Sequence, residues 1–220
     1  NTGLAGKSGK NNRNVTGILG LGLHYVECHD NYTLFDKLAI SYWQRANDKT
    51  TTTTGNLFTK IGYDGLVEVK AENKLAAAYV FLSQGTAFIN GGQEFLRTKR
   101  GNENSYNTSN TSSTSTNGID LTFKDTYSDV YNTYKGLIAL RRANPSAFGA
   151  NASAKAEKVS TGVTKYTTGD FLVYFNATDA EAAISSSGYT KVIDVTSGTP
   201  AESGIIPSTV PAKSFVILTK

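Results

Sequence analysis

The chain has 220 residues, of which 39% are hydrophobic and 18% charged, and its formal net charge is +4. This size and composition suit a globular protein with one large or two small domains. No apolar run approaches the roughly 18–20 residues that cross a bilayer, so we expect no membrane span. The mild positive charge forms no basic run or aromatic-interleaved stripe, so we expect no nucleic-acid partner.

The first half of the chain begins with an irregular, Gly- and Asn-rich connection over residues 1–20. A short buried strand is predicted at 21–27, and it leads directly into a polar cluster at 29–31. A helix should follow, because Thr33 and Asp36 have the spacing of a capping box and apolar residues then recur at helical intervals. The threonine-rich stretch after that helix predicts a loop.

A second helix is predicted over 72–83, followed by a strand over 86–90 that ends in a polar, flexible cluster at 91–94. Two strands that each end in polar residues, with helix between them, indicate successive units of a parallel α/β architecture. The polar segment 97–125 predicts a long loop of the kind that is usually functional or disordered.

The last part of the chain changes from helix to strand character. A helix should begin at a cap provided by Thr126 or Ser128 and end before Pro145. Short alternating runs then predict a small antiparallel β domain from about residue 148. Its strand candidates are 159–167, 171–176, 189–195 and 214–219.

Three blocks of the sequence resemble one enzyme family. Residues 25–38, with His-Asp-Asn at their centre, resemble the seventh-strand motif of α-amylase-superfamily enzymes, in the form seen in type I pullulanases. Residues 91–99, followed by 104–107, resemble the eighth strand and its loop, and residues 134–142 resemble the last barrel helix. The resemblance covers nearly the whole chain in the expected order.

The fold class implied by this resemblance is α/β plus all-β. Residues 1–147 would be the C-terminal part of a catalytic (β/α)8 TIM barrel, containing strands seven and eight with their helices. Residues 148–220 would be a C-terminal antiparallel β-sandwich domain. Two strands cannot close a barrel. The implied partner is therefore the N-terminal portion of the same enzyme, present as a separate chain.

The implied function is that of a debranching glycoside hydrolase, family 13. Such an enzyme cleaves α-1,6-glucosidic bonds in pullulan, starch or glycogen-type α-glucans by a retaining mechanism. Asp30 corresponds to the carboxylate that stabilises the transition state, and His29 to a hydrogen-bond donor to the same sugar. The nucleophile and the acid/base would lie upstream of this sequence, so the chain alone is not expected to be catalytically complete.

Further substrate contacts are expected from residues near these motifs, namely Asn31, Glu94, Asn104, Tyr106 and Asn107. For Glu94 the sequence leaves two roles open: lining the cleft, or bracing the strand end through hydrogen bonds. For the other loop residues, a merely solvated loop is the alternative. Thr86-Ala87 and Leu121 depart from the family pattern, which leaves loop shape and substrate preference open.

The resemblance implies no required cofactor. Calcium often accompanies this superfamily, so Ca²⁺ stays open as a structural ion, although no local cluster of Asp residues in the sequence forms an oxygen cage. The α-glucan substrate implies an extracellular or cell-surface bacterial location, with a cytoplasmic one as the alternative. Two other functions also stay open. One is an α-1,4-acting amylase relative, and the other is a noncatalytic carbohydrate-binding or structural fragment that works through the β domain.

Overall fold

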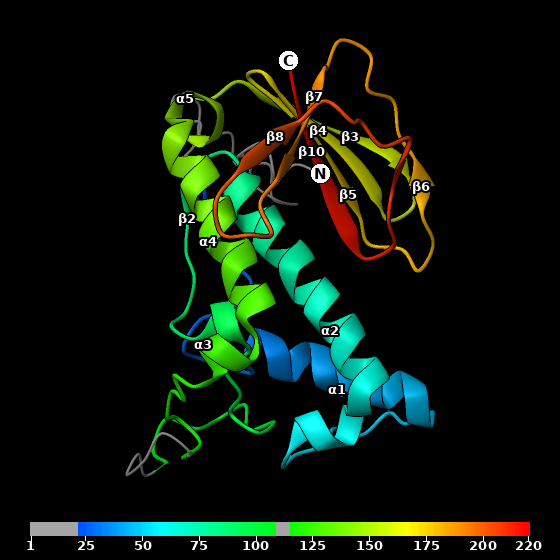
Figure 1. The fold of residues 1–220 in the computed structure, drawn as a ribbon. Coiled ribbons are helices and arrows are strands. Elements are labelled where there is room, and N and C mark those ends of the chain that lie inside the picture. Colours follow the sequence, from blue (N-terminus) through cyan, green and yellow to red (C-terminus); the bar gives the residue numbers. More distant parts are fainter. Residues whose placement is uncertain (1–21, 109–114) are drawn as a thin grey trace, which may run out of the picture. The chain divides into compact units, whose positions relative to one another are not determined.

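The computed structural model describes residues 22–108 and 115–220, which divide into two compact units (Figure 1). The β unit contains the described residues 22–24, 74–88 and 132–220. The α unit contains 25–73 and the described residues of 89–131. Each unit therefore combines segments that are far apart in the sequence. The domain boundary expected after residue 147 stays a prediction.

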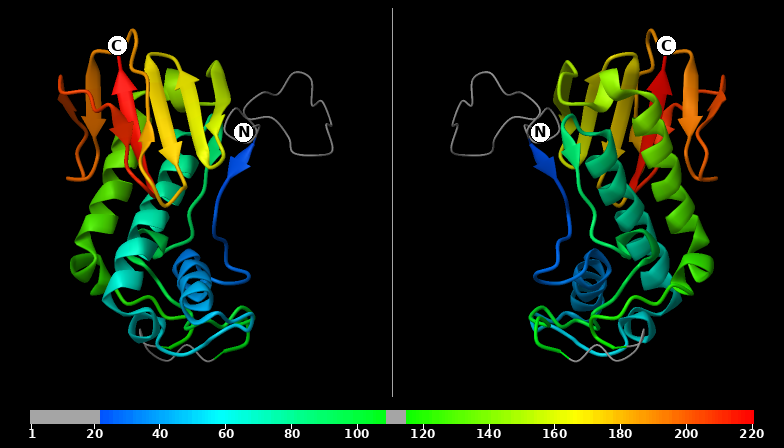
Figure 2. Two further views of the ribbon diagram at one scale, coloured as in Figure 1. Left: turned by 90° about the vertical axis from the view of Figure 1, so that its right-hand side faces the viewer. Right: turned by 90° about the vertical axis from the view of Figure 1, so that its left-hand side faces the viewer.

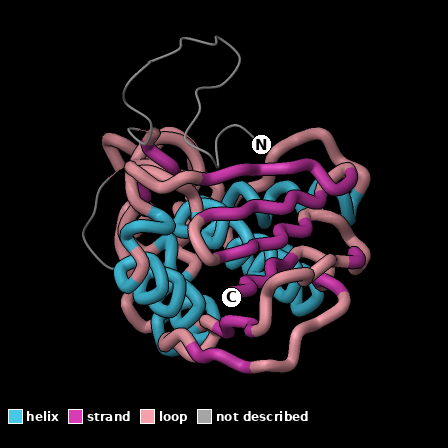
Figure 3. The backbone as a smooth tube through the Cα atoms, turned by 90° about the horizontal axis from the view of Figure 1, so that it is seen from above, coloured by secondary structure: helices cyan, strands magenta, loops and turns pink. Residues whose placement is uncertain are grey.

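A six-stranded antiparallel sheet forms the centre of the β unit, in the order β3-β4-β5-β10-β7-β8 (Figure 3). Its strands are β3 (Ala154–Ser160), β4 (Val163–Thr168), β5 (Phe171–Asn176), β7 (Lys191–Asp194), β8 (Ala201–Ser203) and β10 (Ser214–Thr219). A separate antiparallel pair joins β6 (Ala182–Ala183) and β9 (Thr209–Val210). Figure 2 shows the red β10 beside the yellow β5.

One strand prediction in this sheet is wrong. Residues 159–167 do not form a single strand, because the chain turns at 161–162 and separates β3 from β4. Gly162 has φ +79°, a conformation that glycine adopts without the steric cost of a side chain. The strands predicted at 171–176, 189–195 and 214–219 are confirmed as β5, β7 and β10, with β7 shorter than predicted.

Strand β5 is buried along its whole length because both faces of the sheet are covered. On one face, Leu172 and Leu218 belong to a cluster that includes Val210 of β9. On the other face, Phe175 stacks on Tyr79 with ring centroids 4.1 Å apart. Alternating side chains on a strand point to opposite faces, so this pattern follows from the sequence of β5. The packing agrees with the predicted antiparallel β-sandwich.

Two helices contribute their C-terminal parts to the β unit. They are α2 (Leu57–Leu82) and α4 (Ser128–Ala143). The guanidinium of Arg141 on α4 donates to the carbonyls of Phe81 and Ser83 at 2.7 Å each, and also to that of Gly85. Carbonyls at a helix end have no partner within the helix, so Arg141 satisfies the end of α2.

The predicted helix before Pro145 is confirmed, since α4 begins at Ser128 and ends at Ala143. Pro145 then opens the short helix α5 (Pro145–Phe148). Pro145 therefore both follows the end of one helix and begins another, because its fixed φ and missing N–H suit a first helical position.

The two strands predicted in the first half of the chain pair in parallel. They are β1 (Leu23–His24) and β2 (Thr86–Ala87), with Leu23 opposite Thr86. Both are shorter than predicted, and residue 21 lies outside the described residues. The pair fits the predicted parallel α/β order but does not by itself establish a TIM barrel.

Helix α1 (Leu34–Asn47) begins where the sequence predicts, with the Thr33 hydroxyl accepting from the Asp36 N–H at 3.1 Å. Helix α2 differs from its prediction, because it begins at Leu57 and not near residue 72. A non-helical residue, Gly62 with φ +65°, interrupts this earlier part. Glycine lowers helix propensity, which explains why the pattern over residues 57–71 does not predict a helix.

An aromatic cluster packs within the α unit, in which Phe35 is buried and the other members are partly buried. Phe58 stacks on Phe35 at 4.1 Å and on Tyr127 at 5.3 Å, and it meets Phe123 edge-on at 5.4 Å. Phe123 belongs to the short helix α3 (Phe123–Thr126), and the 3-10 turn η1 spans Gln93–Phe95. This cluster ties the end of the long polar segment to helices α1 and α2. None of the helices in the described ranges has the length and apolar character needed to cross a bilayer.

Candidate functional site

The His29–Asp30 pair lies in a turn of the α unit and presents both side chains to solvent. The side chains are 86% and 72% exposed, and His29 Nε2 lies 3.5 Å from Asp30 Oδ2. Asn31 follows with φ +62°, a left-handed conformation that Asn tolerates better than most residues. The predicted patch is therefore accessible, and its two leading residues are in direct contact.

Beneath this turn, Glu27 is buried and fully engaged. Its Oε2 accepts from the Leu34 N–H at 2.8 Å, and its Oε1 accepts from Asn90 Nδ2 at 2.9 Å. The same amide lies 3.4 Å from the Cys28 carbonyl oxygen. Burial raises the pKa of Glu27, and these hydrogen bonds oppose that shift. Glu27 and Asn90 thus connect the turn to the start of α1 and to the segment after β2.

A second buried carboxylate, Asp36, lies in the first turn of α1. It accepts from the Thr98 hydroxyl, from the Lys99 N–H at 2.8 Å and from the Gly101 N–H at 3.1 Å. Burial raises the pKa of Asp36, and the hydrogen bonds again oppose the shift. Two backbone N–H groups and one hydroxyl of the same loop thus converge on this carboxylate. The predicted cap at Thr33 is confirmed, and Asp36 additionally holds the loop at 98–101.

Lys99 completes the buried network. Its side chain is buried, and Nζ donates to the carbonyl oxygen of His29 at 3.3 Å. Burial lowers the pKa of Lys99, and the nearby charge of Arg97 lowers it further. The carboxylates of Asp36, Glu27 and Asp30 act in the opposite direction. Glu27, Asp36 and Lys99 are not among the predicted site residues, although all three lie inside the sequence motifs at 25–38 and 91–99.

The remaining predicted site residues also lie in the α unit. Glu94 Oε2 accepts from the Gly92 N–H at 3.0 Å, a local contact that favours the bracing role over the cleft-lining one. The Asn104 N–H donates to Asn102 Oδ1 at 3.0 Å. Tyr106 is 82% exposed, and Asn107 is also exposed. Among the predicted residues in the described part of the chain, only His29 and Asp30 meet through their side chains.

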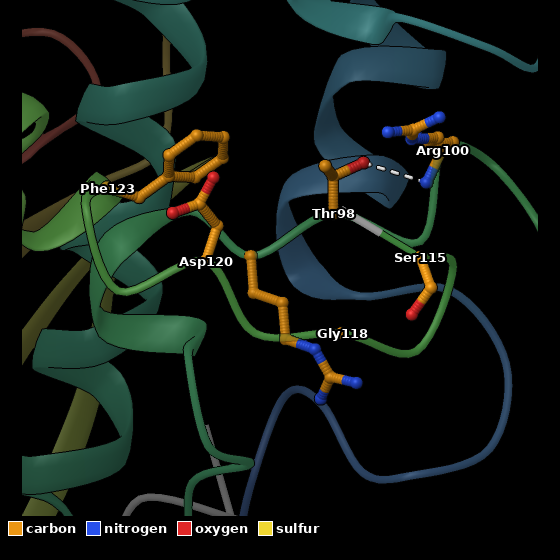
Figure 4. Close-up of a pocket in the computed structure, with 7 residues that line it drawn as sticks. Thr98, Arg100, Ser115, Gly118, Asp120 and Phe123 are labelled. Carbon is orange, nitrogen blue, oxygen red and sulfur yellow. Dashed lines mark hydrogen bonds between the residues drawn. The ribbon is translucent and has the colours of Figure 1, made fainter. Parts of the chain in front are cut away.

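A hollow of about 180 Å³ opens elsewhere in the α unit, between residues 97–100 and 115–123 (Figure 4). Its lining combines two cations, one carboxylate and one aromatic ring with small polar residues: Arg97, Thr98, Arg100, Ser115, Gly118, Asp120 and Phe123. Arg97 Nη2 donates to the Asn117 carbonyl at 2.9 Å, and the Arg100 N–H donates to the Thr98 hydroxyl at 2.8 Å. Such a lining suits a small polar ligand. No predicted site residue lines it.

The described residues contain no group of three or more His, Cys, Asp or Glu side chains arranged to hold a metal ion. A structural Ca²⁺ ion therefore stays an untested expectation. The buried carboxylates accept hydrogen bonds from N–H and hydroxyl donors, which replace the hydration lost on burial.

Comparison with known proteins places this geometry in context. No family model matches the chain. It is 33% identical to pullulanase from Bacillus subtilis (strain 168) over 157 residues, which cover 71% of the chain and 18% of that protein. It is 26% identical to isoamylase from Pseudomonas amyloderamosa over 133 residues, which cover 56% of the chain and 17% of that protein. The chain thus spans less than a fifth of the length of either relative.

The fold leads to the same group. The structure matches that of a pullulanase from Anoxybacillus sp. LM18-11 complexed with maltotriose, with a TM-score of 0.65 and 27% identity. The match covers 93% of this chain and 28% of that one. These relatives are glycoside hydrolases of the debranching type, and the sequence motifs around His29 and Asp30 indicate the same group. The chain is accordingly similar to a segment of the pullulanase-like glycoside hydrolases of family 13.

Proposed function

We propose that this chain is part of a debranching enzyme that hydrolyses α-1,6-glucosidic bonds in α-glucans, and that Asp30 and His29 contact the sugar at the cleavage point. The observation that carries the proposal is the exposed His29–Asp30 pair, whose side chains are free to meet a ligand while their backbone is held by buried groups. The names of the two relatives, pullulanase and isoamylase, support the debranching class.

The proposed chemistry assigns Asp30 an electrostatic role. A retaining glycosidase passes through an oxocarbenium-like transition state, in which positive charge develops on the sugar ring. A fixed carboxylate stabilises that charge, and hydrogen bonds to sugar hydroxyls tighten as the ring flattens. His29 would donate such a bond. Asn31, Asn104, Tyr106 and Asn107 are proposed as further sugar contacts. Glu94, the other predicted contact, is instead proposed to brace the strand end, because its carboxylate accepts from the Gly92 N–H.

The nucleophile and the acid/base would come from a portion of the enzyme outside this sequence. They would have to lie about 5–5.5 Å apart for a retaining reaction. The exposure of Asp30 supports the proposal that another portion of the enzyme completes the site. Water screens the field of an exposed carboxylate and weakens its effect on a transition state. A second portion that covers Asp30 would exclude that water.

The proposed partner is the remaining, N-terminal portion of the same enzyme, with which residues 1–147 would complete a TIM barrel. The parallel pair β1–β2 supports this proposal, since its Leu23 side chain is 53% exposed and Phe88 directly after it is 40% exposed. Short parallel strands with exposed apolar side chains have surface and backbone groups available for further strands. An extracellular or cell-surface location is proposed from the α-glucan substrate alone.

The function is tested with Asp30→Asn in the chain assembled with its upstream portion. The variant keeps the side-chain shape and removes the charge, so kcat on pullulan should fall by about 10²-fold or more, as for loss of one transition-state contact. The matched control is Asp170→Asn, which makes the same change at an exposed carboxylate of the β unit. The control should keep wild-type activity.

Full activity of Asp30→Asn would refute the proposed role of Asp30. Cleavage of linear maltodextrin in preference to pullulan by the wild type would instead favour the α-1,4-acting alternative. The native mass in solution tests whether this chain has the proposed partner. We expect a species much heavier than this chain, which separates under denaturation into two unequal pieces. A lone species at 23.5 kDa would contradict it.

A further inference from the structure

The His29–Asp30 turn has little of its own structure to keep it in place. Both side chains extend into solvent, and Asn31 holds a left-handed backbone conformation. A site that stabilises a transition state needs its groups fixed before the substrate arrives. Backbone contacts from beneath the turn are therefore the means by which the structure can fix it.

Three side-chain contacts, one buried and two partly buried, reach the backbone around the turn. The carboxylate of Glu27 binds the Leu34 N–H, and Asn90 Nδ2 lies 3.4 Å from the Cys28 carbonyl. The third contact comes from Lys99, whose Nζ donates to the His29 carbonyl at 3.3 Å. Of the three, only the Lys99 contact falls on a residue of the proposed site itself.

Lys99 is itself fixed to helix α1. Its backbone N–H donates to Asp36 Oδ2 at 2.8 Å, and its neighbours Thr98 and Gly101 bind the same carboxylate. Asp36 lies in the first turn of α1, which begins three residues after Asn31. A rigid path thus runs from α1 through Asp36 and Lys99 to the His29 carbonyl. A long side chain held at both ends transmits position more accurately than a free one.

We propose that Lys99 is a positioning residue of this site: its buried ammonium clamps the His29 carbonyl and so fixes the direction in which His29 and Asp30 present their side chains to the substrate. This inference rests on the proposed function for its kinetic consequence, but not for its structural one. The charges that face the ammonium are the carboxylates of Asp36, Glu27 and Asp30, together with the cation of Arg97.

The structural consequence is tested by NMR relaxation of backbone amides in the 220-residue chain. Lys99→Met keeps a long apolar stem and removes the donor, whereas Lys99→Arg keeps a charged donor. The matched control is Lys37→Met, which removes an exposed ammonium from α1. In the wild type the amides of residues 28–31 should show order parameters of about 0.85, and in Lys99→Met they should fall below about 0.6.

Residues 34–47 should keep their wild-type order parameters in every variant, and Lys99→Arg should restore much of the order at 28–31. Unchanged order at 28–31 in Lys99→Met would overturn the inference. An equal loss of order in α1 would overturn it as well, because Lys99 would then be a general stabilising residue.

The kinetic consequence is tested in the chain assembled with its upstream portion. Lys99→Met should lower kcat on pullulan at least tenfold with a smaller change in KM, because a misdirected Asp30 loses contacts that matter most in the transition state. Lys99→Arg should recover part of kcat. If the wild type does not hydrolyse pullulan, the proposed function fails, while the relaxation measurement still decides the role of Lys99. A wild-type kcat in Lys99→Met would overturn the inference.

Discussion

The two units of this chain have interiors of opposite character. The β unit buries apolar side chains on both faces of its sheet, including Leu172, Phe175 and Leu218. The α unit also has an aromatic cluster, but beside it the described structure buries two carboxylates, Glu27 and Asp36, and the ammonium of Lys99. The first interior is mainly apolar, with uncharged polar groups such as Asn176 and Thr168 among its buried residues, whereas the second also carries buried charges.

The difference has a functional meaning because buried charges are costly. A buried ion loses its hydration, and hydrogen bonds must replace it. Glu27 and Asp36 have such bonds, and both lie directly beneath or beside the exposed His29–Asp30 turn. Perturbed pKa values cluster at functional sites for this reason. The location of these charges therefore supports a functional role for the turn.

The largest effect is expected from the apolar interior of the β unit. Leu218 is a fully buried residue of β10, the strand between β5 and β7. Leu218→Ala should lower the free energy of unfolding of this unit by about 2–5 kcal/mol. Urea unfolding followed by amide exchange in the sheet measures the loss. The control Ile205→Ala, at a side chain 84% exposed, should change stability by less than about 0.5 kcal/mol. Equal losses in both variants would contradict the packing described here.

A smaller effect is expected from the polar interior of the α unit. Asp36→Ala leaves the Thr98 hydroxyl and the Lys99 and Gly101 N–H groups without their acceptor. The free energy of unfolding of the α unit should fall by about 1–3 kcal/mol, because removing the costly buried charge offsets part of the lost bonding. The same exchange measurement on residues 34–47 tests it, with the exposed Asp125→Ala as control. A loss of stability confined to the β unit would contradict the assignment of this buried charge to the interior of the α unit.

The smallest effect is a dependence on pH. The pKa values of Glu27 and Asp36 are raised in the folded state above their ordinary values of 4.5 and 3.8. The folded state therefore binds protons before the unfolded state does as pH falls. As the pH falls from neutral through the raised pKa values to the ordinary ones, these two groups should increase the free energy of unfolding of the α unit.

Urea midpoints of the α unit at pH 7 and near pH 5 measure this gain. The double variant Glu27→Gln/Asp36→Asn removes both titrating groups and should abolish it. Because these are the buried carboxylates among the described residues, and both lie in the α unit, the core of the β unit should show no comparable gain. A gain of the same size that persists in the double variant would show that other groups cause it.

Features that depend on neighbouring residues could be predicted from the sequence. Thr33 caps α1, α4 ends before Pro145, and β5 and β10 have their predicted bounds, because caps, prolines and alternating side chains act over a few positions. Its motifs also indicated the pullulanase-like family that the comparisons support. Even local patterns failed where a glycine changed the local rule, as at Gly62 within α2 and Gly162 between β3 and β4.

The contacts that support the proposed site could not be predicted, because they join residues far apart in the sequence. The contact of Lys99 with His29 joins residues 70 apart, and that of Thr98 with Asp36 joins residues 62 apart. No local pattern specifies such pairs, so Asp36 reads from sequence as part of a helix cap and Lys99 as a loop cation. Their burial, their bonding and their altered pKa values arise when the segment after β2 closes over the start of α1. The motif thus predicts the exposed residues of the proposed site, and folding alone brings together the buried groups that contact them.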